Sequence, residues 1–532
     1  MSIVTLGFLL FVAAVVLLYY IIPNKYRWCV LLAGSYFFYW MNSQWLLLVL
    51  FATSLVTYLF GLLLQREHNR NQAYLKAHAE LNREEKKAVK EKQKKKNRWI
   101  LSAGIILVLG ALLFLKYFNF FGENLNKLFS SVGTGWVVPH LDLLLPLGIS
   151  FYTLQAISYM VDIYRGKVKA DRNPAKFLLF MSFFPQIVQG PIPRHHQLAN
   201  QLYEGHSLDY DHLRFGAQLV LWGFIKKLVI AERLAIPVNY LFNHYTEYTG
   251  PVLFFAVALY GLQVYTDFSG GMDIARGVAQ MLGIDLELNF KQPYYSTSIE
   301  DFWRRWHITM GSWMKDYIFY PLSLSKAFTF LSRKTRKVLG QFVGKRLPTF
   351  LAMFIVYFCV GFWHGASWKY IAYGIWNGCF IMSGILLEGV YEKGREICRI
   401  NENMVTWRAF RIIRTFIIVS FGRFFSRASD LTTALDMFGR TFINWRNITF
   451  LTNGTLLKTG LNDANWVILA LFVVLLFYID SKHEKGISFR TVLARQPLVF
   501  RWAIYIIAVL SILIFGIYGP EYDAASFIYG NF

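Results

Sequence analysis

Charged residues are scarce in this 532-residue sequence: they make up only 16% of it, whereas hydrophobic residues make up 55%. Soluble domains carry about 25% charged residues, so this composition excludes an ordinary soluble protein. No segment shows the alternating polar and apolar pattern of a strand. We therefore expect an all-α polytopic membrane protein with about 11–13 spans of roughly 20 residues, plus re-entrant segments.

Cysteine is equally scarce. The four cysteines form no CxxC pair and no metal-ligand spacing, and three of them lie in apolar runs: Cys29, Cys359 and Cys379. This pattern excludes a disulfide framework and a zinc-binding cluster. We expect packing roles for these three cysteines and no metal site. Cys398 lies in a charged stretch, and we assign it no role.

Acidic residues are fewer than basic ones, 32 against 55, and the net charge is +23. Membrane proteins collect Lys and Arg in their cytoplasmic loops, so the excess does not indicate a nucleic-acid partner. The first residues show no basic leader and no small-residue cleavage site, which predicts a retained first span over about residues 3–22. If every basic loop is cytoplasmic, the N-terminus and the C-terminal tail at 520–532 lie outside the cell membrane.

The most basic loop, residues 66–98, has 12 lysines and arginines against five acidic residues. Its content of Ala, Glu, Lys and Gln predicts a surface helix. Such a loop can act as an orientation signal, or as a docking site for a soluble acyl carrier or an anionic lipid surface. We expect a single transmembrane domain over residues 1–532, in which this loop is cytoplasmic.

Helix-breaking residues interrupt two apolar segments. "FLLFMSFFPQIVQGPIPR" contains three prolines and a glycine, which predict re-entry or the lining of a cavity instead of a straight crossing. The segment 252–283 contains "DFSGGMD", and we expect its helix to break at Gly270-Gly271. Other late spans are expected near 213–236, 347–364, 367–388 and 408–425.

The same broken segment places Asp267, Ser269 and Asp273 among apolar residues. An isolated carboxylate does not stay ionised in lipid, so each one needs a partner within the protein. The candidate partners are three arginines: Arg276, Arg304 and Arg305. These groups are expected to form a supporting polar network.

Two histidines lie in tryptophan-rich stretches, Trp306-His307 in "DFWRRWHITMGSW" and Trp363-His364 in "VGFWHGASWKY". A titratable ring is costly to hold at membrane depth, which makes it a functional candidate. An imidazole can accept a proton near neutral pH and so activate a hydroxyl. We expect His364 to be catalytic and His307 to be catalytic or supporting, with both tryptophans in the supporting network.

The sequence resembles the membrane-bound O-acyltransferases (MBOAT), and best their bacterial alginate O-acetyltransferase-like branch. The resemblance rests on "YTDFSGGMDIARG", "SIEDFWRRWHITMGSWMKDYIFYPL" and "FWHGASWKYIAYGIWNG", in that order, and on "GISFYTLQAISYMVDIYRG" and "FFPQIVQGPIPR". It implies helices around a central tunnel, with His364 and His307 as the catalytic pair. It also implies a cytoplasmic thioester donor, acetyl-CoA or another acyl thioester, a hydroxyl acceptor, and no further cofactor.

From this resemblance we expect an enzyme that moves acetyl groups outward for O-acetylation of an extracellular or cell-wall polysaccharide. An extracellular SGNH-type acetyltransferase is the expected protein partner, and membrane lipid surrounds the chain. One alternative is D-alanyl transfer to teichoic acid from a carrier protein. Another is a transporter or flippase without chemistry, which would tolerate loss of a basic histidine better than an acyltransferase.

The sequence ends in "SFIYGNF", with Tyr529 outside the membrane in the expected topology. The alginate-like branch has a similar terminal motif, so the resemblance implies that this tyrosine relays the acyl group as an ester. Gly530 and Asn531 depart from the usual pattern. The alternative role of Tyr529 is an interfacial aromatic anchor.

The two roles of Tyr529 separate in a Tyr529→Phe variant, which keeps the aromatic ring but cannot form an ester. If Tyr529 is a relay, we expect acetylation of the external polymer to stop. The check is polymer acetylation in cells, together with a mass-spectrometric search for acetyl-tyrosine on the C-terminal peptide of the wild type. Wild-type acetylation in the variant would leave the anchor role.

Overall fold

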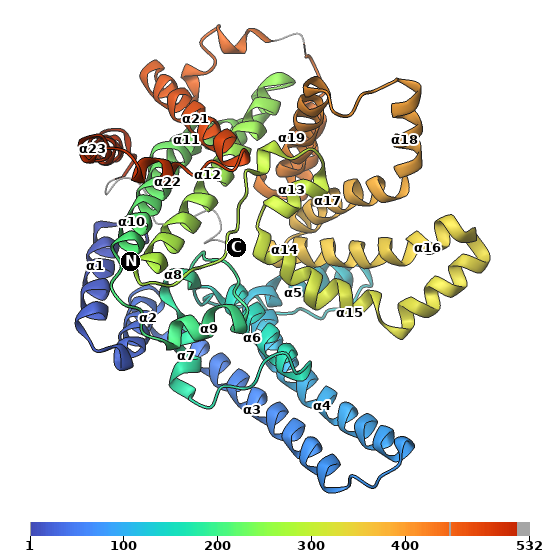
Figure 1. Cartoon of the computed structure of the whole chain (residues 1–532). Coiled ribbons are helices and arrows are strands. Elements are labelled where there is room, and N and C mark those ends of the chain that lie inside the picture. Colours follow the sequence, from blue (N-terminus) through green and yellow to red (C-terminus); the bar gives the residue numbers. More distant parts are fainter. Residues whose placement is uncertain (1, 446–447, 519–532) are drawn as a thin grey trace. The chain divides into compact units, whose positions relative to one another are not determined.

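The structure is a computed structural model that describes residues 2–445 and 448–518 (Figure 1). Over these residues the chain folds into helices joined by loops. The only strand-like feature there is an isolated bridge between Phe290 and Trp306. The described part of the chain thus contains no β-sheet, and the prediction of an all-α protein is confirmed.

Six helical segments are long and apolar enough to cross a membrane, judged by length and composition. They are Asn24–Ala77, Arg83–Ser131, Pro251–Met281, Gly340–His364, Asp463–Glu484 and Leu498–Phe515. A pair of helices bent by 65°, Trp368–Leu386 and Glu388–Ile397, would make a seventh. The chain is a multi-pass membrane protein. Its described residues supply fewer spanning segments than the expected number of about 11–13.

Several expected spans are shorter than predicted or are divided by charged residues. The segment expected at 3–22 forms α1 (Leu6–Ile21), a helix of only 16 residues. The segment expected near 213–236 divides into three pieces, α10 (Tyr210–Phe224), η4 (Ile225–Ala231) and α11 (Glu232–Asn243). It carries four adjacent or nearby charged residues: Lys226, Lys227, Glu232 and Arg233. Four charged residues are more than any of the six candidate membrane spans carries in its apolar part.

Contacts divide the chain into two compact units. The first comprises residues 1–217 and 275–287, and the second comprises residues 218–274 and 288–532. The first contains α1, α2 (Arg27–Ser43), α3 (Leu47–Ala77), α4 (Arg83–Leu112), α5 (Phe118–Ser131), α6 (Ile149–Tyr164), α7 (Pro174–Ser182), α8 (Phe184–Ile187) and α9 (His195–Tyr203). The single domain and the central tunnel stay predictions.

Small residues let three helices of the first unit pack closely. A Cβ atom at Gly61 of α3 would lie 2.8 Å from the Tyr159 ring of α6, and one at Gly104 of α4 would lie 2.8 Å from Met160 Sδ of α6. The absence of a side chain at both positions therefore allows α3 and α4 to approach α6. Short side chains are a common means of helix association in membranes.

The basic loop predicted at 66–98 is a helical hairpin, which corrects the expectation of one surface helix. Helices α3 and α4 run side by side in Figure 1 and continue from the apolar segments into the charged region without a break. The turn between them ends at Asn82, whose side chain accepts a hydrogen bond from Glu85 N in a capping box. Lys96 pairs with Glu67 across the hairpin at 2.8 Å.

The proline-containing segment forms no long helix. Its two helices, α7 and α8, have nine and four residues, too few to cross a bilayer. Gln155 Nε2 donates a hydrogen bond to Phe180 O at 2.7 Å, so α6 satisfies one of its backbone groups. The prediction that no straight helix crosses here is confirmed, whereas re-entry into the membrane stays a prediction.

The second unit contains η4, α11, most of α12 (Pro251–Met281), α13 (Ile299–Arg305), α14 (Ile308–Met314), α15 (Tyr320–Ser323), α16 (Lys326–His364), α17 (Trp368–Leu386), α18 (Glu388–Ile397), α19 (Val405–Arg427), α20 (Leu431–Arg440), α21 (Asp463–Glu484), α22 (Phe489–Ala494) and α23 (Leu498–Phe515). The predicted break of α12 at Gly270 is wrong, because α12 is one continuous helix. A Cβ atom at Gly270 would lie 2.9 Å from Gly223 O, so this glycine serves close helix packing instead of a turn.

Candidate active site

The backbone holds the Trp306-His307 pair between α13 and α14. Lys291 N donates a hydrogen bond to Arg305 O at 2.9 Å, and Ile308 N donates one to Asn289 O at 3.1 Å. These bonds flank the bridge between Phe290 and Trp306. His307 itself has φ 49° and ψ 53°, a left-handed conformation that is strained for a residue with a side chain. The flanking bonds keep the imidazole at a defined position despite that strain.

A hydrogen-bond pattern around Asn289 indicates the tautomer of His307. Asn289 Oδ1 accepts hydrogen bonds from Thr309 N at 2.9 Å and from Thr309 Oγ1 at 3.0 Å, which identifies this atom as the amide oxygen. His307 Nδ1 lies 3.4 Å from the same oxygen. Because an amide oxygen only accepts hydrogen bonds, a bond between these two atoms requires the proton on Nδ1 and the lone pair on Nε2.

His307 lies outside the six candidate membrane spans and is fully buried. Burial lowers the pKa of His307 well below its ordinary value, and the nearby His364 lowers it further. The ring is therefore neutral at physiological pH. A neutral imidazole with its lone pair at Nε2 can accept a proton or a hydrogen bond there.

His364 is the last residue of α16, where the chain turns into α17. A Cβ atom at Gly374 of α17 would lie 3.0 Å from Gly361 Cα of α16, so glycines let the two helices pack closely. A Cβ atom at Gly365 would collide with the Tyr370 ring. The small residues around His364 thus permit a tight turn that fixes the imidazole at the end of the helix.

Trp363 brings the two predicted histidines to one site. Its ring centroid lies 5.7 Å from that of His307 and 5.0 Å from that of His364. Phe268 packs against His307 at 4.9 Å, and Tyr373 packs against His364 at 5.7 Å. Aromatic side chains therefore pack against both imidazole rings, and such walls limit the access of water to them.

The carboxylates of α12 pair with two buried lysines of η4. Lys227 forms ion pairs with Asp267 and, at 2.6 Å, with Glu232. Lys226 pairs with Asp273 and donates a hydrogen bond to Ser269 Oγ at 3.0 Å. Sequence reasoning considered arginines as partners and missed both lysines. Their signal was two adjacent lysines in the apolar stretch "LWGFIKKLVIA".

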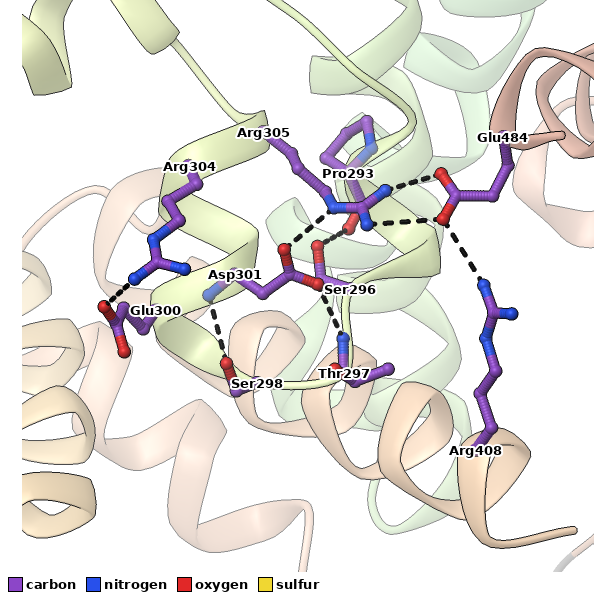
Figure 2. Close-up of polar contacts among 10 residues, drawn as sticks. All are labelled: Pro293, Ser296, Thr297, Ser298, Glu300, Asp301, Arg304, Arg305, Arg408 and Glu484. Atoms are coloured by element: carbon purple, nitrogen blue, oxygen red, sulfur yellow. Dashed lines mark hydrogen bonds and ion pairs between the residues drawn. The ribbon is translucent and has the colours of Figure 1, made fainter. Parts of the chain in front are cut away.

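The two arginines that precede Trp306 pair with other carboxylates (Figure 2). Arg305 bonds Asp301 at 2.9 Å and Glu484 at 2.6 Å, and Arg408 bonds Glu484 at 3.3 Å. This network joins α13 to α19 and α21 and so fixes the helix that carries the Trp306-His307 pair. Arg304 is exposed and pairs with Glu300 one helical turn away, a contact that contributes little stability.

Sequence reasoning also missed Arg423 of α19, whose side chain is only 2% exposed. Its guanidinium carbon lies 4.7 Å from the centre of the Trp306 ring, and Nη2 donates a hydrogen bond to Tyr294 Oη at 3.3 Å. Phe302 stacks on Trp306 at 5.4 Å. Arg423 thus helps to position the residue next to His307. A lone arginine in the apolar stretch "VSFGRFF" was the available signal.

Tyr529, the possible acyl relay, lies in 519–532, outside the described residues, and its role stays a prediction. Over the described part of the chain, no group of three or more His, Cys, Asp or Glu side chains could hold a metal ion.

Known proteins are similar to this chain over much of its length. The MBOAT family, membrane-bound O-acyltransferases, matches residues 168–425, which include His307, His364 and Arg423. A protein of Pseudomonas syringae pv. tomato named "Probable alginate O-acetylase AlgI" is 33% identical over 481 residues, which cover 89% of this chain and 82% of that protein. A peptidoglycan O-acetyltransferase of Helicobacter pylori is 30% identical over 367 residues, 64% of each chain. A teichoic acid D-alanyltransferase of Bacillus subtilis is 29% identical over 243 residues, which cover 45% of this chain and 58% of that one.

The position of Arg423 can be tested by an Arg423→Lys variant, which keeps the charge but loses the planar group that stacks on Trp306. We expect kcat for acyl transfer to fall on the order of tenfold while KM for the acyl donor stays unchanged, because only the catalytic geometry shifts. The measurement is the rate of acyl transfer by purified protein over a range of donor concentrations. Arg427→Lys is the matched control, because Arg427 lies one turn later and stacks on Phe242 instead. A wild-type kcat for Arg423→Lys would contradict the positioning role.

Proposed function

The chain belongs to the membrane-bound O-acyltransferase family, and from this and the paired histidines we propose that it O-acetylates an extracellular or cell-wall polysaccharide. The chain is an O-acyltransferase and a multi-pass membrane protein. The placement of both imidazoles against Trp363 carries the catalytic part of the proposal. The long match to an alginate O-acetylase and the match to a peptidoglycan O-acetyltransferase support an acetyl group and a polysaccharide acceptor.

The donor in this proposal is acetyl-CoA or another acyl thioester, bound from the cytoplasmic side. The acceptor oxygen attacks the thioester carbonyl carbon, and the carbon–sulfur bond breaks. His364 takes the proton from the attacking hydroxyl and passes it to the departing thiolate, so an ester and a free thiol result. A histidine base can perform this exchange without a metal ion.

The tautomer of His307 narrows its role. With the proton on Nδ1, next to Asn289, the neutral ring has no proton at Nε2 to offer to a developing oxyanion. Nε2 can instead accept a hydrogen bond from the N–H of His364, so that the other nitrogen of His364 takes the proton of the incoming hydroxyl. We therefore assign His307 to orienting its partner histidine, and not to stabilising an oxyanion.

Once the acetyl group has crossed the membrane, it needs an acceptor on the outer side. In the proposal, an extracellular SGNH-type acetyltransferase receives the group, directly or through Tyr529. A second candidate function is D-alanyl transfer to teichoic acid, which the match to the Bacillus subtilis enzyme supports over 45% of the chain. Supplying purified protein with acetyl-CoA or with a D-alanyl carrier protein, and measuring which thioester is consumed, distinguishes the two.

The catalytic pair is tested by alanine substitution. We expect His364→Ala to lower acyl transfer about 10²-fold or more, because the general base is lost, and His307→Ala to impair it less. The measurement is acetylation of surface polysaccharide at matched membrane expression. His244→Ala is the control, because His244 is an exposed histidine of the same unit. Near-normal acetylation in a well-expressed His364→Ala strain would refute the site, and would favour a transporter without chemistry.

The proposed orientation is tested by cysteine labelling in a background without the four native cysteines. Ala88→Cys, in the helical hairpin, should be shielded from an impermeant thiol reagent in intact cells, since basic segments stay in the cytoplasm. Asn531→Cys should be labelled. Both positions should react after the membrane is permeabilised, which controls for accessibility. Labelling of Ala88→Cys in intact cells would reverse the orientation.

A further inference from the structure

The helical hairpin of α3 and α4 carries its positive charge unevenly. Residues 90–98 of α4 contain six basic residues and one acidic residue. Residues 76–87, around the tip, contain four basic and three acidic residues. Most of the excess charge therefore lies at the end of the hairpin that joins the apolar part of α4. An electrostatic contact with an anionic partner is therefore expected at this end of the hairpin, and would be much weaker at the tip.

The exposed face of α4 presents this charge to the surroundings. The opposite face contacts α3: Gln93 Nε2 donates to Glu67 Oε2 at 3.1 Å, and Asn97 is buried. All six basic residues of the cluster are exposed, and one of them, Lys96, pairs with Glu67. The other five are Lys90, Lys92, Lys94, Lys95 and Arg98. Within the described part of the chain, no carboxylate lies within ion-pair distance of any of these five. We call these five residues the basic face.

The basic face lies next to the place where α4 enters lipid. Trp99, which follows directly, is 71% exposed, and tryptophan prefers the membrane–water interface. Beyond it α4 is apolar up to Leu112. At about 1.5 Å per residue, Lys90 lies roughly 14 Å from Trp99 along the helix and Arg98 lies within about 2 Å. Most of the basic face is thus within about one Debye length, roughly 8–10 Å, of the headgroups.

We propose that the basic face of α4 binds the anionic phospholipid headgroups of the surrounding membrane. Exposed cations, an adjacent interfacial tryptophan and a rigid helical support are the features that such headgroups recognise. An acidic soluble protein would have its best access at the tip of the hairpin, where the net charge is small. The contact would anchor the hairpin at the membrane surface, a role separate from acyl transfer.

The test compares two variants of the full-length chain that each lose three positive charges. Lys94→Gln/Lys95→Gln/Arg98→Gln removes the part of the basic face nearest the headgroups, and the control Lys76→Gln/Arg83→Gln/Lys87→Gln removes exposed charges near the tip. Gln favours helices about as well as Lys and Arg, so both hairpins should form. Protein in a neutral detergent is titrated with phosphatidylglycerol, or with phosphatidylcholine as reference, and native mass spectrometry counts the bound lipid.

We expect wild-type protein and the tip control to prefer phosphatidylglycerol, and this preference to fall as salt is raised. A lysine or arginine near an anionic surface strengthens binding by a factor of about five, so the loss of three should make the basic-face variant bind its first phosphatidylglycerol about a hundredfold more weakly. Three results would overturn the proposal: no preference in the wild type, a preference that the basic-face variant keeps, or an equal loss in both variants. The last would show that binding follows the total charge of the hairpin instead of the basic face, and no preference in the wild type would leave an acidic protein as the partner.

Discussion

Burial of polar side chains among apolar helices is the constraint on which the structure depends. Lipid supplies no hydrogen-bond partners, so every buried charge must be matched by a group of the same protein. Lys227 meets this requirement with two carboxylates, Asp267 and Glu232, and Lys226 meets it with Asp273. Removing one member of such a pair leaves the other buried and unmatched, which costs more than the pair itself contributes. These ion pairs therefore determine which faces of η4 and α12 can meet.

Close helix packing makes such matching possible, and glycine provides it. Gly223 and Gly270 let the backbones of α10 and α12 approach closely. At this distance Lys226 can donate its hydrogen bond to Ser269. Gly361 and Gly374 do the same for α16 and α17 and place His364 at the turn between them. Close packing of this kind takes the place of the hydrophobic effect, which gives little drive for association between helices already in lipid.

The candidate site combines a strained backbone with aromatic surroundings. The left-handed conformation of His307 is held by hydrogen bonds to the segment around Asn289, and Trp306 is held between Phe302 and the Arg423 guanidinium. The ring of His307 cannot turn without losing its contact to Asn289. A site of this kind needs little reorganisation when charge develops, which is the main advantage of a preorganised environment for catalysis.

Composition and local pattern were enough to predict the all-α membrane class and the helix-breaking character of the proline-containing segment. They also indicated the two histidines as candidate site residues, because each of these features depends on a single segment. The late helices near 347–364 and 367–388 were also predictable, since both are long and apolar. The lysine partners of Asp267 and Asp273, the stacking of Arg423 on Trp306 and the tautomer of His307 were not. Each depends on which side chains from distant segments meet, and spacing along the chain does not contain that information. Only the tertiary structure could decide that Gly270 serves packing within a continuous helix, because a glycine that permits a turn and one that permits close approach are identical in sequence.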